Sequence, residues 1–330
     1  MQAMGKEPTS VAVLAEKKEA PVLSASAVKE TVSKIKFEEG NFASQVSELD
    51  ALVESDKLGL WKAATTSSVG TNSPAPLRTY PVSLNFLEQR TGGKITAESL
   101  GVGGADDVSL DDFKYATLAV TLGSSVAGIA SLAFLPENVG ASFCYFFAVI
   151  PILFLGIGST TPGIIAGAIA SLRNSPEEQT DQVDRVCRHE AGHFLCGYLC
   201  GLPVKAYSAN DLGVPCVEFY PSTDGEARGR ELSSEEIAAM TVVAMSGSVA
   251  EALNFGEAKG GENDLMELDF LLRRSKEFVG AQQQQDLTRW GALTAYNIIK
   301  ANEDKFERLV DAFKANKSVS DCIAAIEGSN

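Results

Sequence analysis

Both histidines of this 330-residue chain lie in one short stretch, CRHEAGHFLC, where His189 and His193 are four residues apart. On a helix, positions i and i+4 lie on one face, so both imidazoles can reach the same metal ion. A zinc ion takes such nitrogen ligands at about 2.0–2.1 Å. Glu190 follows the first histidine, where its carboxylate can accept a proton from metal-bound water. The stretch therefore predicts a catalytic Zn²⁺ site with His189 and His193 as ligands and Glu190 as general base.

A third ligand must come from elsewhere, because catalytic zinc takes three protein ligands and keeps one position open. The chain has no third histidine. Two downstream carboxylates are candidates, Glu251 in MSGSVAEALNFG and Asp264 in GGENDLMELDF, and spacing alone does not choose between them. In the alternative interpretation, the two histidines are hydrogen-bonded within a core helix and bind no metal.

Cys196 and Cys200 lie on the same helical face as His189 and His193, one and two turns further along. They cannot join the histidines around one tetrahedral ion, because Cys200 lies about 16 Å along the helix axis from His189. Free cysteine is among the most buried residue types, so core packing beneath the site is the expected role. A redox-sensitive thiol close to the metal is the alternative.

HEAGH and the later segment MSGSVAEALNFGEAKGGENDL together resemble the peptidase domain of the FtsH family of membrane-bound, ATP-dependent zinc proteases. The resemblance covers residues 183–325 and has three anchors in the same order: HEAGH, a small-residue helix with Ala-Glu, and Asn-Asp-Leu. It implies zinc as the cofactor, Asp264 as the third ligand beside His189 and His193, and Glu190 as the catalytic glutamate. Glu251 matches the glutamate of Ala-Glu and would lie outside the ligand set.

The chain departs from this family in two respects. It passes from the apolar segment ending in ASL to CRHEAGH without room for an ATPase module, and it contains no G-x-x-x-x-G-K-[ST] loop, so we expect no ATP binding. The segments LPVKAYSAN and VPCVEFYP are shortened counterparts of the family's substrate-edge strand, and Ser246-Gly247-Ser248 replaces its Gly-Gly-Arg. These changes bear on the choice of substrate more than on metal binding.

Two uncharged runs precede this domain. The first, Tyr115 to Leu135, is long enough to cross a hydrocarbon core of about 30 Å. The second, Val139 to Leu172, is too long for one span, so we expect a break at GIGSTTPG. Residues 142–157 would then form the second span, and GIIAGAIASL a short third helix. The prediction is a membrane hairpin over residues 115–172, with a buried hairpin of a soluble protein as the alternative.

The rest of the chain divides by composition. Residues 1–80 alternate charged residues with Ala, Ser, Thr and Val and end in a Pro/Ser/Thr-rich run, which predicts a disordered or partly helical tether. Within the tether, FASQVSELDALVESDKLGLWKAA has apolar residues at helical intervals and predicts one amphipathic helix. Residues 81–114 form a predicted linker, and residues 173–330 a mainly helical, FtsH-peptidase-like domain.

Charge and cysteine content narrow the classes of partner. The chain carries 28 basic and 43 acidic residues, a net charge of −15, which disfavours nucleic acid as a partner. Its six cysteines are scattered without a CxxC pair and indicate reduced thiols. The expected fold class is mainly α, with a transmembrane helical hairpin followed by a zincin-type (HExxH) metallopeptidase-like domain.

The expected activity is hydrolysis of unfolded or flexible protein segments by zinc-activated water, without ATP. The expected partners are protein or peptide substrates, a lipid bilayer, and FtsH-type protease complexes or further copies of the chain. A helical hairpin joined to a peptidase-like domain without the ATPase is similar to nuclear-encoded chloroplast membrane proteins, which implies the thylakoid or inner envelope membrane. The alternatives are an inactive metal-binding scaffold or chaperone, and a membrane protein whose histidines bind nothing.

Overall fold

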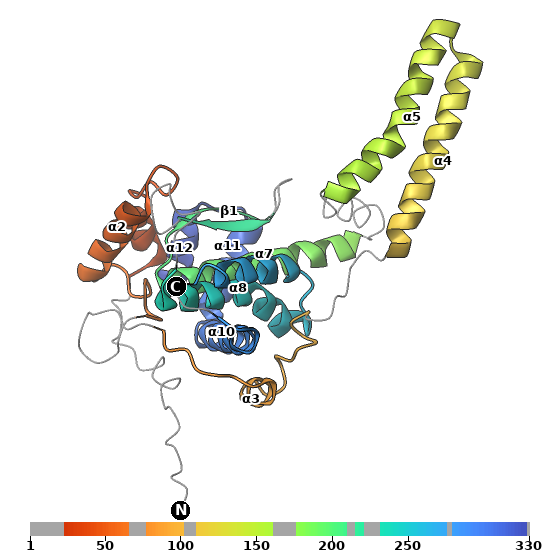
Figure 1. Cartoon of the computed structure of the whole chain (residues 1–330). Coiled ribbons are helices and arrows are strands. Elements are labelled where there is room, and N and C mark those ends of the chain that lie inside the picture. The colour runs from red at the N-terminus through yellow and green to blue at the C-terminus, as the bar shows by residue number, and fades with distance from the viewer. Residues whose placement is uncertain are drawn as a thin grey trace, which may run out of the picture. The chain divides into compact units, whose positions relative to one another are not determined.

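The structure is a computed structural model that describes residues 23–65, 77–101, 110–160, 176–209, 215–220, 232–275 and 279–328. These residues contain eleven helices and one two-stranded sheet, so the prediction of a mainly α fold is confirmed (Figure 1). The chain divides into two compact units. The smaller unit comprises Ala105–Asp181, and the larger unit comprises Met1–Gly104 together with Gln182–Asn330.

The smaller unit is a helical hairpin of α4 (Leu110–Phe134) and α5 (Glu137–Thr160), which lie side by side (Figure 1). Gly140 allows the close approach, because a Cβ atom there would lie 2.6 Å from the carbonyl oxygen of Ser131. The Ser131 hydroxyl in turn donates a hydrogen bond to the carbonyl oxygen of Gly140, at 3.1 Å. The second helix starts earlier than the predicted residue 142, because two residues suffice for the turn. The predicted break began at Gly156, and this start is wrong, because α5 continues as a helix to Thr160. The rest of the predicted break and the short third helix lie outside the described residues.

By length and composition, three helices of the described residues could cross a membrane. Two of them are α4 and α5, whose apolar stretches are only 11% and 6% buried. Large side chains such as Val126, Ile129 and Ile152 are more than 60% exposed on this hairpin. The third helix, α8 (Ser234–Phe255), is 78% buried over its apolar stretch, so protein already covers its apolar surface. The exposed apolar surface of α4 and α5 is what a lipid-facing hairpin requires.

The core of the larger unit forms around α8, which packs between α7 (Pro176–Cys200) and α10 (Ala281–Ala301). A glycine stands at each crossing: a Cβ atom at Gly192 of α7 would lie 2.6 Å from the Ser246 carbonyl oxygen, and one at Gly291 of α10 would lie 2.8 Å from that of Thr241. The sequence sets both ends of α8, with the capping box of Ser233 at its start and a left-handed Gly256 at its end. The HEAGH stretch of α7 therefore lies against α8, whose apolar stretch is 78% buried.

The remaining elements of the C-terminal half surround this core (Figure 1). The two predicted counterparts of an edge strand form an antiparallel pair, β1 (Val204–Ser208) and β2 (Cys216–Phe219). The other helices are α9 (Glu262–Leu272), α11 (Glu303–Lys314) and α12 (Val319–Glu327). The Phe219 ring of β2 packs on Gly197, where a Cβ atom would lie 2.3 Å from it. The strand pair therefore lies against α7, one turn beyond His193.

The N-terminal segment is packed, so the prediction of a tether is wrong for residues 23–65. They form α1 (Ala25–Val32) and α2 (Phe42–Glu54), and α2 confirms the predicted amphipathic helix. Val28, Leu49 and Trp61 are at most 2% exposed and belong to the same core as α7 and α8. Low average hydrophobicity misled the prediction, because a few well-placed apolar residues suffice when a complementary surface lies elsewhere in the chain.

The prediction of a linker is likewise wrong for residues 81–101. They include α3 (Leu84–Arg90), and Val82, Leu87 and Ile95 are fully buried in the core of the larger unit. The Ala258 amide donates a 2.7 Å hydrogen bond to the carbonyl oxygen of Ser99, which joins this segment to the loop between α8 and α9. The predicted linker thus supports a loop next to the candidate metal centre.

Glu327 at the end of α12 joins the C-terminal helix to the N-terminal segment. Its carboxylate accepts hydrogen bonds from the backbone amides of Gly59, Leu60 and Trp61, at 2.8 to 3.1 Å. It also accepts a 2.8 Å hydrogen bond from the hydroxyl of Tyr198 on α7. One carboxylate therefore holds together the two ends of the unit and the helix that carries the histidines.

We expect Glu327→Ala to lower the free energy of unfolding by about 1–3 kcal/mol, because it leaves these donors without their acceptor. Urea denaturation of the detergent-solubilised protein, followed by tryptophan fluorescence, measures the change. The matched control is Glu39→Ala, since the Glu39 side chain is 69% exposed and its loss should cost at most about 0.5 kcal/mol. Equal unfolding midpoints for the two variants would contradict the proposed role of Glu327.

Candidate metal centre

Helix α7 carries His189, Glu190 and His193 into the interior, where each is 6–7% exposed. The two imidazole rings stand one turn apart with their centroids 4.7 Å from each other. Gly247 of α8 leaves the space that the His189 ring needs, because a Cβ atom there would lie 2.4 Å from Nε2 of His189. The helical spacing therefore places the two rings next to each other, and Gly247 lets α8 approach the first of them.

Asp264 reaches the same place from the first turn of α9. Its Oδ2 lies 2.9 Å from Nε2 of His189 and 3.4 Å from Nε2 of His193. One ligand atom from each of the three residues therefore lies within 4.8 Å of the others, an arrangement that can hold a metal ion. The structure thus brings together the three residues that the resemblance implies.

The outer hydrogen bonds of the histidines determine which ring nitrogen carries the lone pair. Nδ1 of His193 lies 2.8 Å from the carbonyl oxygen of Val243, which can only accept, so Nδ1 carries the hydrogen. Nδ1 of His189 lies 2.6 Å from Oε1 of Glu251, which also acts as the acceptor. In the neutral rings, both Nε2 lone pairs therefore face Asp264. Such outer partners are those that orient metal-ligating histidines in proteins.

The donor set fits a divalent metal ion. Two ligand atoms at about 2.0–2.1 Å from a tetrahedral zinc ion are about 3.3 Å from each other. The observed distances from Oδ2 of Asp264 to Nε2 of His189 and of His193, 2.9 and 3.4 Å, are close to this value. Glu190 supplies a second observation, because its Oε2 is buried without a hydrogen-bond partner among the described residues. Two imidazoles with one carboxylate suit several transition metals, so the donors do not by themselves identify the ion.

The charges of the site also favour a cation. Burial lowers the pKa of His189, but its hydrogen bonds with Asp264 and Glu251 outweigh burial and raise this pKa to about 10. Burial raises the pKa of Asp264, yet the two histidines outweigh burial and hold it below its usual range. Burial also raises the pKa of Glu190, against the opposing effect of both histidines. Three carboxylates around two rings therefore attract positive charge, which either protons or a divalent cation can supply.

Glu251 and Asp264 occupy different sides of His189. Glu251 contacts Nδ1, while Asp264 faces Nε2 of both rings. Burial raises the pKa of Glu251, but His189, Arg185 and the Lys259 amide outweigh burial and lower it. The geometry thus makes Asp264 the better third ligand and Glu251 the orienting partner of His189. Val243 and Arg185 were not predicted from the sequence. Only Arg185 could have been, because it lies four residues before His189 and so on the same face of the helix.

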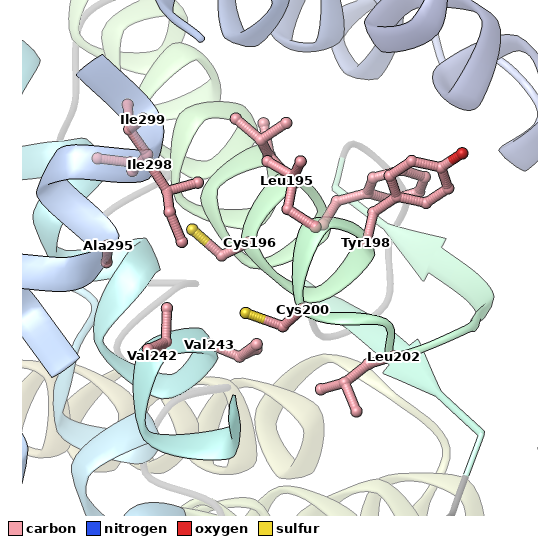
Figure 2. Close-up of a cluster of buried hydrophobic side chains, with 14 of the residues drawn as sticks. Leu195, Cys196, Tyr198, Cys200, Leu202, Val242, Val243, Ala295, Ile298 and Ile299 are labelled. Atoms are coloured by element: carbon pink, nitrogen blue, oxygen red, sulfur yellow. The ribbon is translucent and has the colours of Figure 1, made fainter. Parts of the chain in front are cut away.

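Cys196 and Cys200, which follow the histidines on α7, lie in the hydrophobic core. Figure 2 shows their sulfur atoms among side chains of α8 and α10, which include Val242, Val243 and Ile298. Cys196 is 0% and Cys200 7% exposed, so the prediction of core packing is confirmed. Burial raises the pKa of Cys200 to about 12 and that of Cys196 well above its usual value, which disfavours the reactive thiolate. All six cysteines are free thiols.

Comparison with protein-family models, with characterised proteins and with solved structures gives no match. The fold and the site define a mainly helical protein with apolar helices long enough to cross a membrane and a His-His-Asp cluster, its histidines buried, that can hold a metal ion.

Proposed function

We propose that the chain is a membrane-anchored zinc metallopeptidase, related to the peptidase domain of the FtsH family, that cleaves unfolded or flexible protein segments without ATP. The observation that carries the proposal is the convergence of three ligand atoms, His189 Nε2, His193 Nε2 and Asp264 Oδ2. Next to them, one oxygen of the buried Glu190 carboxylate has no hydrogen-bond partner among the described residues. Zinc is the proposed ion, because two imidazoles and one carboxylate with an open position are a known catalytic zinc set.

In the proposed reaction, His189, His193 and Asp264 hold the metal, and Glu251 keeps the His189 ring in place. A zinc ion bound there would lower the pKa of a coordinated water to about 7 and polarise the substrate carbonyl. Glu190 accepts a proton from the attacking water and transfers it to the leaving amine, which is the work of a general acid–base. Its position in the chain directly after His189 suits this role. Within the part of the chain that the structure describes, no hydrogen-bond partner competes for its Oε2.

Substrates would be extended segments, because the chain has no phosphate-binding loop and cannot use ATP to unfold proteins. The β1–β2 pair lies against α7, and within the described residues each of its strands has one unpaired edge. An extended peptide can pair with such an edge. The hairpin of α4 and α5 is the proposed membrane anchor, and FtsH-type complexes or further copies of the chain are the proposed partners. On its resemblance to plant and algal proteins, we assign the protein to a chloroplast membrane, either the thylakoid or the inner envelope.

The test begins with membranes that contain the full chain. Alkaline carbonate should leave the protein in the membrane fraction, and the detergent-solubilised protein should contain about one zinc ion per chain. It should cleave unfolded casein, lose this activity after treatment with 1,10-phenanthroline, and recover it when zinc is added. Release by carbonate would contradict the anchor, and a protein without metal would contradict the enzyme. Zinc without cleavage would favour the alternative of a metal-binding scaffold or chaperone.

A further inference from the structure

Arg185 lies on α7 one turn before His189 and makes three contacts next to the metal centre. Its Nη1 donates hydrogen bonds to Oε2 of Glu251, at 2.8 Å, and to the carbonyl oxygen of Glu257, at 2.7 Å. Its guanidinium carbon lies 4.3 Å from the centre of the Phe255 ring. The side chain is only 19% exposed, so these contacts hold it in one place. The HExxH pattern itself does not specify the residue at this position.

Glu251, the partner of Arg185, is a saturated acceptor. Its Oε1 bonds Nδ1 of His189 at 2.6 Å and the Gly260 amide at 3.2 Å. Its Oε2 bonds the Lys259 amide at 3.0 Å in addition to Arg185. The same carboxylate therefore holds the ring of one histidine and the loop that leads into α9. Since α9 carries Asp264 in its first turn, Glu251 influences two of the three proposed ligands.

An arginine suits this place better than any other residue. The Glu251 side chain is 2% exposed, and a buried carboxylate is costly unless a cation and several hydrogen bonds compensate it. The guanidinium group is always charged, and the two N–H bonds of Nη1 lie in its rigid plane and point to two different acceptors. Here these acceptors are Glu251 and the Glu257 carbonyl, which follows the last turn of α8. Arg185 thereby joins α7 to the end of α8 and fixes the orientation of the Glu251 carboxylate.

We propose that Arg185 is a positioning residue of the metal centre. Through Glu251 it holds the His189 ring and the 257–261 loop in the arrangement that presents Nε2 and Asp264 to one ion. This inference rests on the metal site of the proposed function, but it does not require that the site cleave peptides. Loss of an outer-shell partner of a metal ligand lowers metal affinity by about 10-fold to 100-fold, and we expect a loss of this size without Arg185.

The test measures the affinity of the solubilised full chain for Co²⁺, whose visible absorption reports both binding and ligand geometry. Arg185→Gln should weaken Co²⁺ binding by about 10-fold to 100-fold. Arg188→Gln is the matched control: Arg188 lies on the same helix, is 14% exposed and pairs with Asp184 and Glu307 at 3.1 and 2.7 Å, without contacting Glu251. It should bind Co²⁺ as the unmodified chain does. Thermal unfolding of both variants without metal separates lost stability from lost positioning.

Arg185→Lys keeps the charge, but its ammonium group lacks the rigid planar geometry that directs the two N–H bonds of Nη1, so it should retain part of the affinity. If Arg185→Gln does not fold, Arg185→Lys compared with Arg188→Lys decides, and equal Co²⁺ affinities would overturn the inference. The same holds if Arg185→Gln folds and binds Co²⁺ as tightly as the unmodified chain. An unmodified chain that binds no Co²⁺ would instead refute the metal site itself, a result distinct from failure of the role of Arg185.

Discussion

Glu190→Gln should reduce the cleavage of unfolded casein by about a hundredfold or more, while the zinc content stays that of the unmodified protein. Glutamine has nearly the shape of glutamate but cannot accept and return the proton of the attacking water. The charges of both histidines and of Asp264 act on the Glu190 carboxylate. Its Oε2 has no hydrogen-bond partner among the described residues. The substitution therefore removes the general base and leaves the three proposed ligands untouched. Rates of casein cleavage and zinc content per chain provide the two measurements.

The control for this experiment is Glu267→Gln, a change of the same chemistry at an exposed position of α9. It should leave both cleavage and zinc content unchanged. A second readout is functional rescue of cells that lack the protein. If Glu190→Gln rescues such cells as well as the unmodified chain does, the protein acts without proteolysis, and the scaffold interpretation replaces the enzyme.

Asp264→Ala should cause the largest loss of metal affinity, beyond the roughly 100-fold upper range for outer-shell partners. Asp264 is the only carboxylate that faces Nε2 of both histidines within the described residues, so no other oxygen near them replaces it. Zinc or Co²⁺ titration of the solubilised chain measures the loss. The purified variant should also contain less zinc than the unmodified protein.

Glu251→Gln provides the comparison for Asp264→Ala. The sequence alone predicts no loss for a change at Glu251, but its 2.6 Å contact with Nδ1 of His189 now predicts a loss within the range of an outer-shell partner. Asp264→Ala should therefore lose more affinity than Glu251→Gln. The reverse order would move the third ligand to Glu251 and refute the geometry described above.

The features that the sequence alone determined are those with short-range causes. His189 and His193 share a face because of the helical repeat, and Ser233 starts α8 because its side chain accepts from the Glu236 amide three residues later. The uncharged runs that form α4 and α5 are likewise visible in consecutive residues, since length and the absence of charge suffice to define them. Each of these features depends on neighbours within a few turns of helix.

Only the tertiary structure decided how distant segments meet. Asp264 and Glu251 are 75 and 62 residues from His189, and which of them faces Nε2 depends on where α8 and α9 cross α7. The same crossing places the Val243 carbonyl on His193 and the Glu251 carboxylate between Arg185 and His189. The packing of residues 23–65 and 77–101 could not be predicted either, because it depends on distant parts of the chain: the Trp61 ring, for example, packs on that of Tyr198 of α7. Composition reports how apolar a segment is, whereas its folding depends on whether another part of the chain offers a complementary surface.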